Sequence, residues 1–186
     1  MMIDQQAIFD VLRTIPDPEM PISIVDLGLI ESVAIDPPLP AREGPGVRAD
    51  GAERGCTIRI VALPTFVGCP ALDMIRRDIE ERLGAMPGVA SVVVQWVNDP
   101  PWSVDRISES GRESLREHGV TVPTHGHRLE VHGAATVALT VGAAAVPCPF
   151  CGSSKTRQES PFGPTRCRMI YYCDACRNSF EHLKRV

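Results

Sequence analysis

The sequence has no long hydrophobic run, no basic leader and no excess of positive charge. Its longest apolar stretch, residues 134–146, is interrupted by Thr136 and Thr140. It falls short of the roughly 18 apolar residues that a membrane-spanning helix needs. The first residues contain neither the basic patch nor the apolar segment of a signal peptide. We therefore expect a cytoplasmic protein without a membrane partner.

Charge is unevenly distributed along the chain. The sequence carries 19 Lys and Arg against 23 Asp and Glu, a net charge of -4. Residues 148–186 hold seven basic and three acidic residues, a net +4, whereas residues 1–147 hold twelve and twenty, a net -8. The overall acidity argues against binding to nucleic-acid phosphates. The change in composition predicts a separate module over residues 148–186. The order of the elements expected from apolar periodicity predicts a domain over residues 1–120, which leaves a linker over 121–147.

Apolar periodicity predicts a small α+β domain in the first part of the chain. The expected elements are a helix over residues 4–14, strands over 29–35 and 56–62, a helix over 69–84, a strand over 89–97 and a polar helix over 108–118. Residues 36–55 contain four prolines and four glycines, so we interpret them as a mobile loop. The predicted order is helix, strand, strand, helix, strand.

The seven cysteines point to metal rather than to disulfides. Their number is odd, and five of them lie in the last 39 residues. Two Cys-x-x-Cys pairs, Cys148 with Cys151 and Cys173 with Cys176, have the spacing of a zinc ribbon. Four unrelated buried thiols, or iron in a rubredoxin-like site, are the alternatives. A shell of four cysteines leaves no open coordination position, so the predicted zinc site is structural.

The remaining candidate ligands do not fit this site. Cys167 precedes Cys173 by six residues, about 20 Å along an extended strand, so we interpret it as a spare thiol outside the cage. The histidines have irregular spacing, and we expect them in exposed loops. They are His118, His125, His127, His132 and His182.

A second cysteine site is predicted where a strand meets a helix. The segment from Thr65 to Pro70 places Cys69 at the expected start of the helix over 69–84. A helix N-terminus stabilises a thiolate, so Cys69 is a candidate ligand or nucleophile. The alternative is that Cys69 only caps the helix. Asp17 and Glu19, in a proline-rich loop, are either metal-binding or solvated carboxylates.

Two motifs resemble a known family. Residues 15–30, IPDPEMPISIVDLGLI, and residues 63–70, LPTFVGCP, are similar to the two signatures of the metal-sulfur cluster assembly domain. This resemblance covers roughly residues 5–100. With the segment NDPPWS at 98–103 and the C-terminal double Cys-x-x-Cys, the whole chain resembles the D subunits of the phenylacetyl-CoA epoxidase system.

The resemblance implies an accessory protein of aerobic phenylacetate degradation that assists maturation of an iron-sulfur cluster or iron centre. It implies that Cys69 handles a transient Fe-S cluster or iron, with Asp17 and Glu19 nearby, while the ribbon cysteines bind structural Zn. The implied partners are subunits of the epoxidase, especially its iron-sulfur reductase. Because a single Cys69 is too few for a cluster, we also predict a homodimer or an obligate complex.

Three other functions remain open. The chain could be a structural subunit of the oxygenase complex, in which Cys69 has no role in transfer. A zinc-ribbon module that binds nucleic acid is the second alternative, and a thiol enzyme is the third. We expect no catalytic activity of the chain's own, because no residue pattern indicates a base for Cys69.

Overall fold

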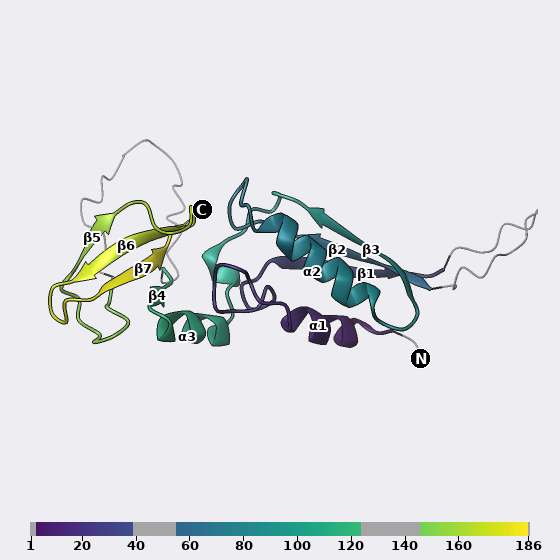
Figure 1. The fold of residues 1–186 in the computed structure, drawn as a ribbon, viewed down its shortest axis with the longest axis horizontal. Helices are drawn as coiled ribbons and strands as arrows, with labels where there is room; N and C mark the ends of the chain where they lie inside the picture. Colours follow the sequence, from purple (N-terminus) through teal and green to yellow (C-terminus); the bar gives the residue numbers. More distant parts are fainter. Residues whose placement is uncertain (1–2, 39–54, 124–145, 186) are drawn as a thin grey trace, which may run out of the picture. The chain divides into compact units, whose positions relative to one another are not determined.

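Residues 3–38, 55–123 and 146–185 are described by a computed structural model of the chain. Contacts divide the chain into two units, Met1–Gly111 and Arg112–Val186. Each unit contains its own β-sheet, which confirms the predicted α+β class (Figure 1). None of the helices in the described ranges has the length and apolarity to cross a bilayer.

The first unit follows the predicted order of elements. In sequence they are α1 (Gln5–Arg13), β1 (Ile30–Asp36), β2 (Cys56–Ala62), α2 (Leu72–Gly84) and β3 (Val89–Trp96), followed by the short 3-10 helix η1 (Val104–Arg106). The sheet order is β1-β2-β3. β1 runs antiparallel to β2, and β2 runs parallel to β3 through the α2 crossover.

Alternation along the strands separates a buried face of this sheet from an open one. Ile58 and Ile60 of β2 are fully buried, as are Ile75 and Ile79 of α2 and Leu12 of α1. Each such side chain contributes about 2 kcal/mol of burial free energy. Asp4 fixes the start of α1 as predicted, because its carboxylate accepts the Ala7 N–H at 2.8 Å.

The opposite face of the sheet carries exposed side chains. Ala34 pairs with Arg59, and Arg59 pairs with Val93, so these residues form one row across the three strands. All three are exposed, and Val93 retains 49% of its accessible surface. This face is therefore not covered by any element of the first unit's described residues.

The second unit is a four-stranded sheet preceded by a helix. Its elements are α3 (Glu109–Glu117), which spans the division, then β4 (Val120–Thr121), β5 (Thr156–Ser160), β6 (Arg168–Cys173) and β7 (Ser179–Leu183). The sheet order is β4-β7-β6-β5 (Figure 1). β4 runs parallel to β7, and the other pairs are antiparallel.

One feature of the organisation differs from the sequence-based expectation. The division between units falls after Gly111, whereas the predicted first domain ends at residue 120, because β4 pairs with β7 and so ties the residues before it to the ribbon sheet. Of the predicted linker over 121–147, residues 124–145 lie outside the described part. The same holds for residues 39–54 of the predicted loop.

Candidate functional site

Four cysteines of the second unit form one compact group of sulfur atoms. The Sγ atoms of Cys148, Cys151, Cys173 and Cys176 all lie within 4.8 Å of one another. The Sγ atoms of Cys148 and Cys176 are 3.6 Å apart, and those of Cys151 and Cys173 are 3.7 Å apart. Zn–S bonds of about 2.3 Å imply sulfur pairs about 3.8 Å apart in a regular tetrahedron. The four donors therefore fit a structural zinc ion.

Local backbone hydrogen bonds shape the two turns that carry these cysteines. In the first turn, Gly152 N–H donates to the Cys148 carbonyl at 2.9 Å. In the second, Arg177 N–H donates to the Cys173 carbonyl at 2.8 Å. Cys148 and Cys173 are buried, whereas Cys151 is exposed. Because protein sulfurs fill all four positions, the arrangement holds a metal and leaves none of its positions for a substrate.

The thiols of Cys151 and Cys176 differ in how readily they ionise. Backbone hydrogen bonding at Asn178 lowers the pKa of Cys176 to about 7. Backbone hydrogen bonding at Ser153 acts in the same direction on Cys151, but the partial loss of hydration and the hydrogen bonds with the neighbouring sulfurs raise the pKa of this thiol to about 12. A bound divalent cation stabilises the thiolate form of its cysteine ligands.

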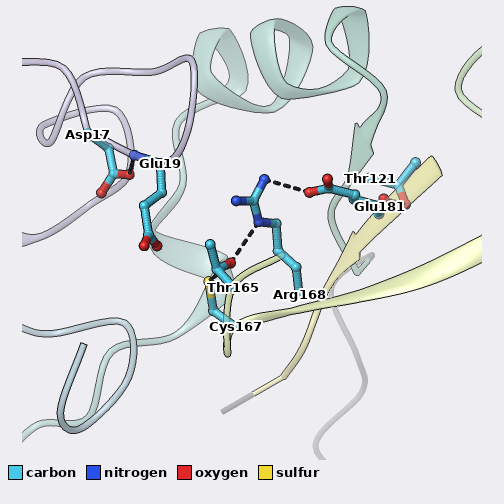
Figure 2. A network of polar contacts seen from close by, with 7 residues as sticks. All are labelled: Asp17, Glu19, Thr121, Thr165, Cys167, Arg168 and Glu181. Carbon is cyan, nitrogen blue, oxygen red and sulfur yellow. Dashed lines mark hydrogen bonds and ion pairs between the residues drawn. The ribbon is translucent and has the colours of Figure 1, made fainter. Parts of the chain in front are cut away.

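Cys167 and His182 lie elsewhere in the second unit. Cys167 is outside the four-sulfur group, as predicted, and its Sγ lies 3.2 Å from Thr165 Oγ1. Figure 2 shows Arg168 donating to Thr165 and pairing with Glu181. The prediction that His182 occupies an exposed loop is wrong.

His182 is buried in β7, where alternation turns its ring inward. Nδ1 hydrogen-bonds with Thr121 Oγ1 at 2.8 Å, and the ring packs edge-on against Tyr171. Of the other histidines, His118 is exposed as expected. The remaining three, His125, His127 and His132, lie outside the described residues.

The acidic loop of the first unit is held by its own backbone. Asp17 N–H donates to the Ile22 carbonyl at 2.9 Å, and Pro16 bridges to Ser23. The Asp17 carboxylate accepts the Glu19 N–H at 2.9 Å, as Figure 2 shows. Asp17 is only 9% exposed and Glu19 is half-buried. The two carboxylates are therefore parts of an ordered loop rather than freely solvated charges.

Cys69 lies in the loop that joins β2 to α2. It is half-buried, between the exposed residues Gly68 and Pro70. The expectation that Cys69 occupies the helix cap is wrong, because Cys69 and Pro70 form a turn and α2 begins only at Leu72. In this turn, Leu72 N–H donates to the Cys69 carbonyl at 3.3 Å. The thiol thus precedes the helix by three residues.

The acidic loop and the Cys69 loop leave the sheet at the same end. Leu63 N–H donates to the Leu29 carbonyl at 2.8 Å, directly beyond the paired residues Ile30 and Ala62. The structure does not gather Asp17, Glu19 and Cys69 into a metal-ligand group. In the described ranges, the ribbon cysteines form the only group of three or more potential ligand atoms.

Residues 98–108 contain side chains that hold the backbone just before β1, and sequence reasoning missed them. Trp102 Nε1 donates to the Leu27 carbonyl at 3.0 Å, and Arg106 Nε donates to the Gly28 carbonyl at 2.8 Å. Gly28 has φ +75°, and a Cβ there would lie 2.5 Å from Arg106 Cβ. The tryptophan and the glycine in an apolar run were the sequence signals that could have indicated this contact.

Asp26 adds a polar clamp to the same segment. Its carboxylate accepts hydrogen bonds from Ser108 Oγ at 2.6 Å and from Ser23 Oγ at 2.8 Å. The bond from Ser108 is the main cause that lowers the pKa of Asp26 below its ordinary value. The clamp fixes the acidic loop relative to the segment that follows β3.

Comparisons with known proteins agree with both parts of the chain. The family model described as "Iron-sulfur cluster assembly protein" matches residues 5–39, and the "PaaD zinc beta ribbon domain" matches residues 132–184. An Fe-S protein maturation auxiliary factor of Porphyromonas gingivalis is 31% identical over 60% of this chain and 90% of its own length. A factor of the same name from Bacillus subtilis is 29% identical over 60% of this chain and 92% of its own length.

A relative in Escherichia coli (strain K12) matches across both units. It carries the name of the D subunit of a 1,2-phenylacetyl-CoA epoxidase, and it is 33% identical over 96% of this chain and 92% of its own length. The match therefore spans the assembly signatures of the first unit as well as the ribbon. The chain belongs to the family of phenylacetyl-CoA epoxidase D subunits, in which an iron-sulfur assembly domain precedes a zinc ribbon.

Proposed function

We propose that the chain is an accessory protein that delivers iron or an iron-sulfur cluster to a component of an epoxidase acting on a phenylacetyl-CoA thioester. Cys69 is the thiol that handles this cargo in the cytoplasm. The names of its relatives, the D subunit of an epoxidase and two Fe-S maturation factors, support the client and the reaction class. The observation that carries the proposal is the position of Cys69 on a half-buried loop outside the four-cysteine group.

The contrast with the ribbon explains why Cys69 suits transfer. A carrier must exchange ligands, so it needs a thiol whose metal bonds form and break during an encounter with the client. The ribbon surrounds its metal with four sulfurs and favours retention. A single Cys69 leaves the remaining ligand positions to the client, to an external thiol or to a second copy.

The acidic loop contributes to the proposed site in two ways. Asp17 shapes the loop, since its carboxylate accepts the Glu19 N–H. Glu19 supplies a half-buried carboxylate on the loop that joins the same end of the sheet as Cys69. Carboxylate oxygens are suited to iron rather than to the sulfide of a cluster. The partner within the epoxidase is, in this proposal, the iron-sulfur reductase.

Replacement of Cys69 tests the proposal. We expect Cys69→Ser, produced together with the epoxidase subunits, to lower the iron and labile-sulfide content of the reductase severalfold while the complex still assembles. Cys56→Ser is the matched control, because Cys56 is also a half-buried thiol of the first unit. Elemental analysis and visible absorption of the purified reductase provide the readout. Unchanged cluster content with Cys69→Ser would leave only a structural role in the complex.

A further inference from the structure

The two edge strands of the β1-β2-β3 sheet differ in whether side chains bond to their outward backbone groups. At the β1 edge, Gln5 Nε2 donates to the Val33 carbonyl at 2.9 Å, and Arg106 Nη2 donates to the Ile30 carbonyl at 3.0 Å. β1 also carries the charged Glu31, and its register with β2 shifts at the start of the strand. Charged residues and irregular pairing protect an edge strand against association with another chain.

Among the described residues, the β3 edge has less of this protection. Its register with β2 also shifts, between Val89 and Ser91, but no side chain bonds to the outward backbone beyond that point. Its eight residues, VASVVVQW, include no charge and no proline. Val97 N–H donates to the Ala62 carbonyl, so the backbone groups of Val92, Val94 and Trp96 point away from β2 by alternation. Throughout residues 3–38, 55–123 and 146–185, no side chain forms a hydrogen bond with these outward groups.

The side chains in the middle of this edge, Val92 to Val94, are apolar as well, while Ser91 and Gln95 are exposed on the open face. Val92 and Val94 are half-buried on the helix-covered face, and Val93 is 49% exposed on the open face. A strand of this length, with free backbone donors and acceptors and apolar side chains, is a template for an additional strand. The regular pairing of Thr57 to Ala62 with Ser91 to Trp96 shows that no bulge interrupts this part of the template.

We propose that β3 pairs antiparallel with β3 of a second copy of this chain, so that the sheet continues as β1-β2-β3-β3-β2-β1. β3 carries no charge, so a charged strand from another protein would gain no ion pair by pairing with it. A second copy of β3 is equally uncharged, so this pairing places no like charges opposite each other. Antiparallel pairing of a strand with itself is also satisfied by a twofold axis, the commonest symmetry of protein oligomers.

This pairing has a consequence for metal handling that rests on the proposed function of Cys69. Cys69 follows the carboxyl end of β2, which runs parallel to β3. An antiparallel β3 pair therefore directs the two Cys69 loops to opposite ends of the continuous sheet, on the order of 20 Å apart for strands of this length. The two thiols cannot share one cluster, so the client or an external thiol completes each site.

Sedimentation equilibrium of the full chain, loaded with zinc, tests the pairing. Val93→Lys places a charge at the middle of β3 on an already exposed position, and we expect the dimer dissociation constant to rise about tenfold. Ala34→Lys is the matched control, since Ala34 is exposed in the same row, neighbours Arg59 as Val93 does, and lies on the protected edge. We expect this control to dimerise like the original chain.

Two further readouts sharpen the test. Residues 1–111 hold nine basic and seventeen acidic residues, so added salt should strengthen the dimer by screening repulsion. Hydrogen exchange at Val92, Val94 and Trp96 should slow as protein concentration rises.

A folded chain that sediments as a monomer at all concentrations overturns the proposal, even if β3 accepts a strand from the client. Equal dissociation constants for both lysine variants overturn it too. Neither outcome bears on the cluster-transfer result for Cys69→Ser, so the two proposals fail separately.

Discussion

Four sulfurs of the ribbon lie within 4.8 Å of one another, whereas Cys69 stands in a loop of the other unit, outside that group. The ribbon cysteines are supplied by two turns with their own backbone hydrogen bonds. Cys69 is supplied by a single turn between β2 and α2. The number of sulfurs that one chain presents therefore separates a site that retains metal from one suited to exchange it.

Removal of a ribbon ligand should have the largest effect. Cys173 is fully buried, and Cys173→Ser should abolish zinc binding and unfold the ribbon, because the metal contributes on the order of 10 kcal/mol to the folding of such modules. Amide resonances of β1, β2 and β3 should persist. Cys167→Ser, which changes another buried thiol of the same unit, should keep zinc. Retention of stoichiometric zinc by Cys173→Ser would contradict a four-cysteine site.

The stability of the first unit should depend on its backbone conformation at two glycines and not on zinc. Gly28 and Gly68 both have positive φ, but a Cβ at Gly28 would meet Arg106, whereas a Cβ at Gly68 has open space. We expect Gly28→Ala to lower the free energy of unfolding by about 3 kcal/mol and Gly68→Ala by about 1 kcal/mol. Urea unfolding monitored on the first unit measures both. Equal losses would mean that the close contact between Gly28 and Arg106 adds no cost to the substitution.

A smaller effect is expected on the pH dependence of the stability of the ribbon. Burial, together with the nearby Arg185, lowers the pKa of His182 from 6.5 to about 4. Between pH 6.5 and about 4, His182 is protonated in the unfolded chain but stays neutral in the folded ribbon. This contribution to the free energy of unfolding is therefore largest above pH 6.5 and declines as the pH falls toward 4.

His182→Gln should therefore flatten the loss of ribbon stability between pH 7 and pH 5, since glutamine does not titrate in this range. Chemical unfolding of zinc-loaded protein at the two pH values measures the slope. Acid release of zinc affects both forms, so their difference isolates the histidine. Identical slopes for the variant and the original chain would show that His182 is not held neutral by the fold.

Local patterns in the sequence predicted the parts of the structure that depend on near neighbours. Asp4 caps α1, β2 has the expected bounds, and the ribbon cysteines form one group. Each of these follows from residue spacing within a few positions or from paired Cys-x-x-Cys motifs. The position of Cys69 at a helix cap was wrong because Pro70 and the following residue extend the turn before α2 begins.

Contacts between distant residues were beyond reach of such patterns. Trp102 bonds to Leu27 across 75 positions, and Arg106 bonds to Gly28 across 78. The burial of His182 depends on the β7 register with β6 and on Thr121 from β4. β4 itself is only two residues long and carries no periodicity that a sequence can display. Its pairing with β7 set the division between units.

Metal retention under a chelator tests the contrast between the two sulfur sites most directly. Protein loaded anaerobically with zinc, then with isotopically labelled iron, sulfide and an external thiol, is exposed briefly to a ferrous chelator and analysed for both metals. We expect zinc to stay with the chain while labelled iron leaves, and Cys69→Ser to keep its zinc but never acquire the iron. Iron that replaces zinc in the ribbon, or that binds Cys69→Ser to the same extent, would contradict the account.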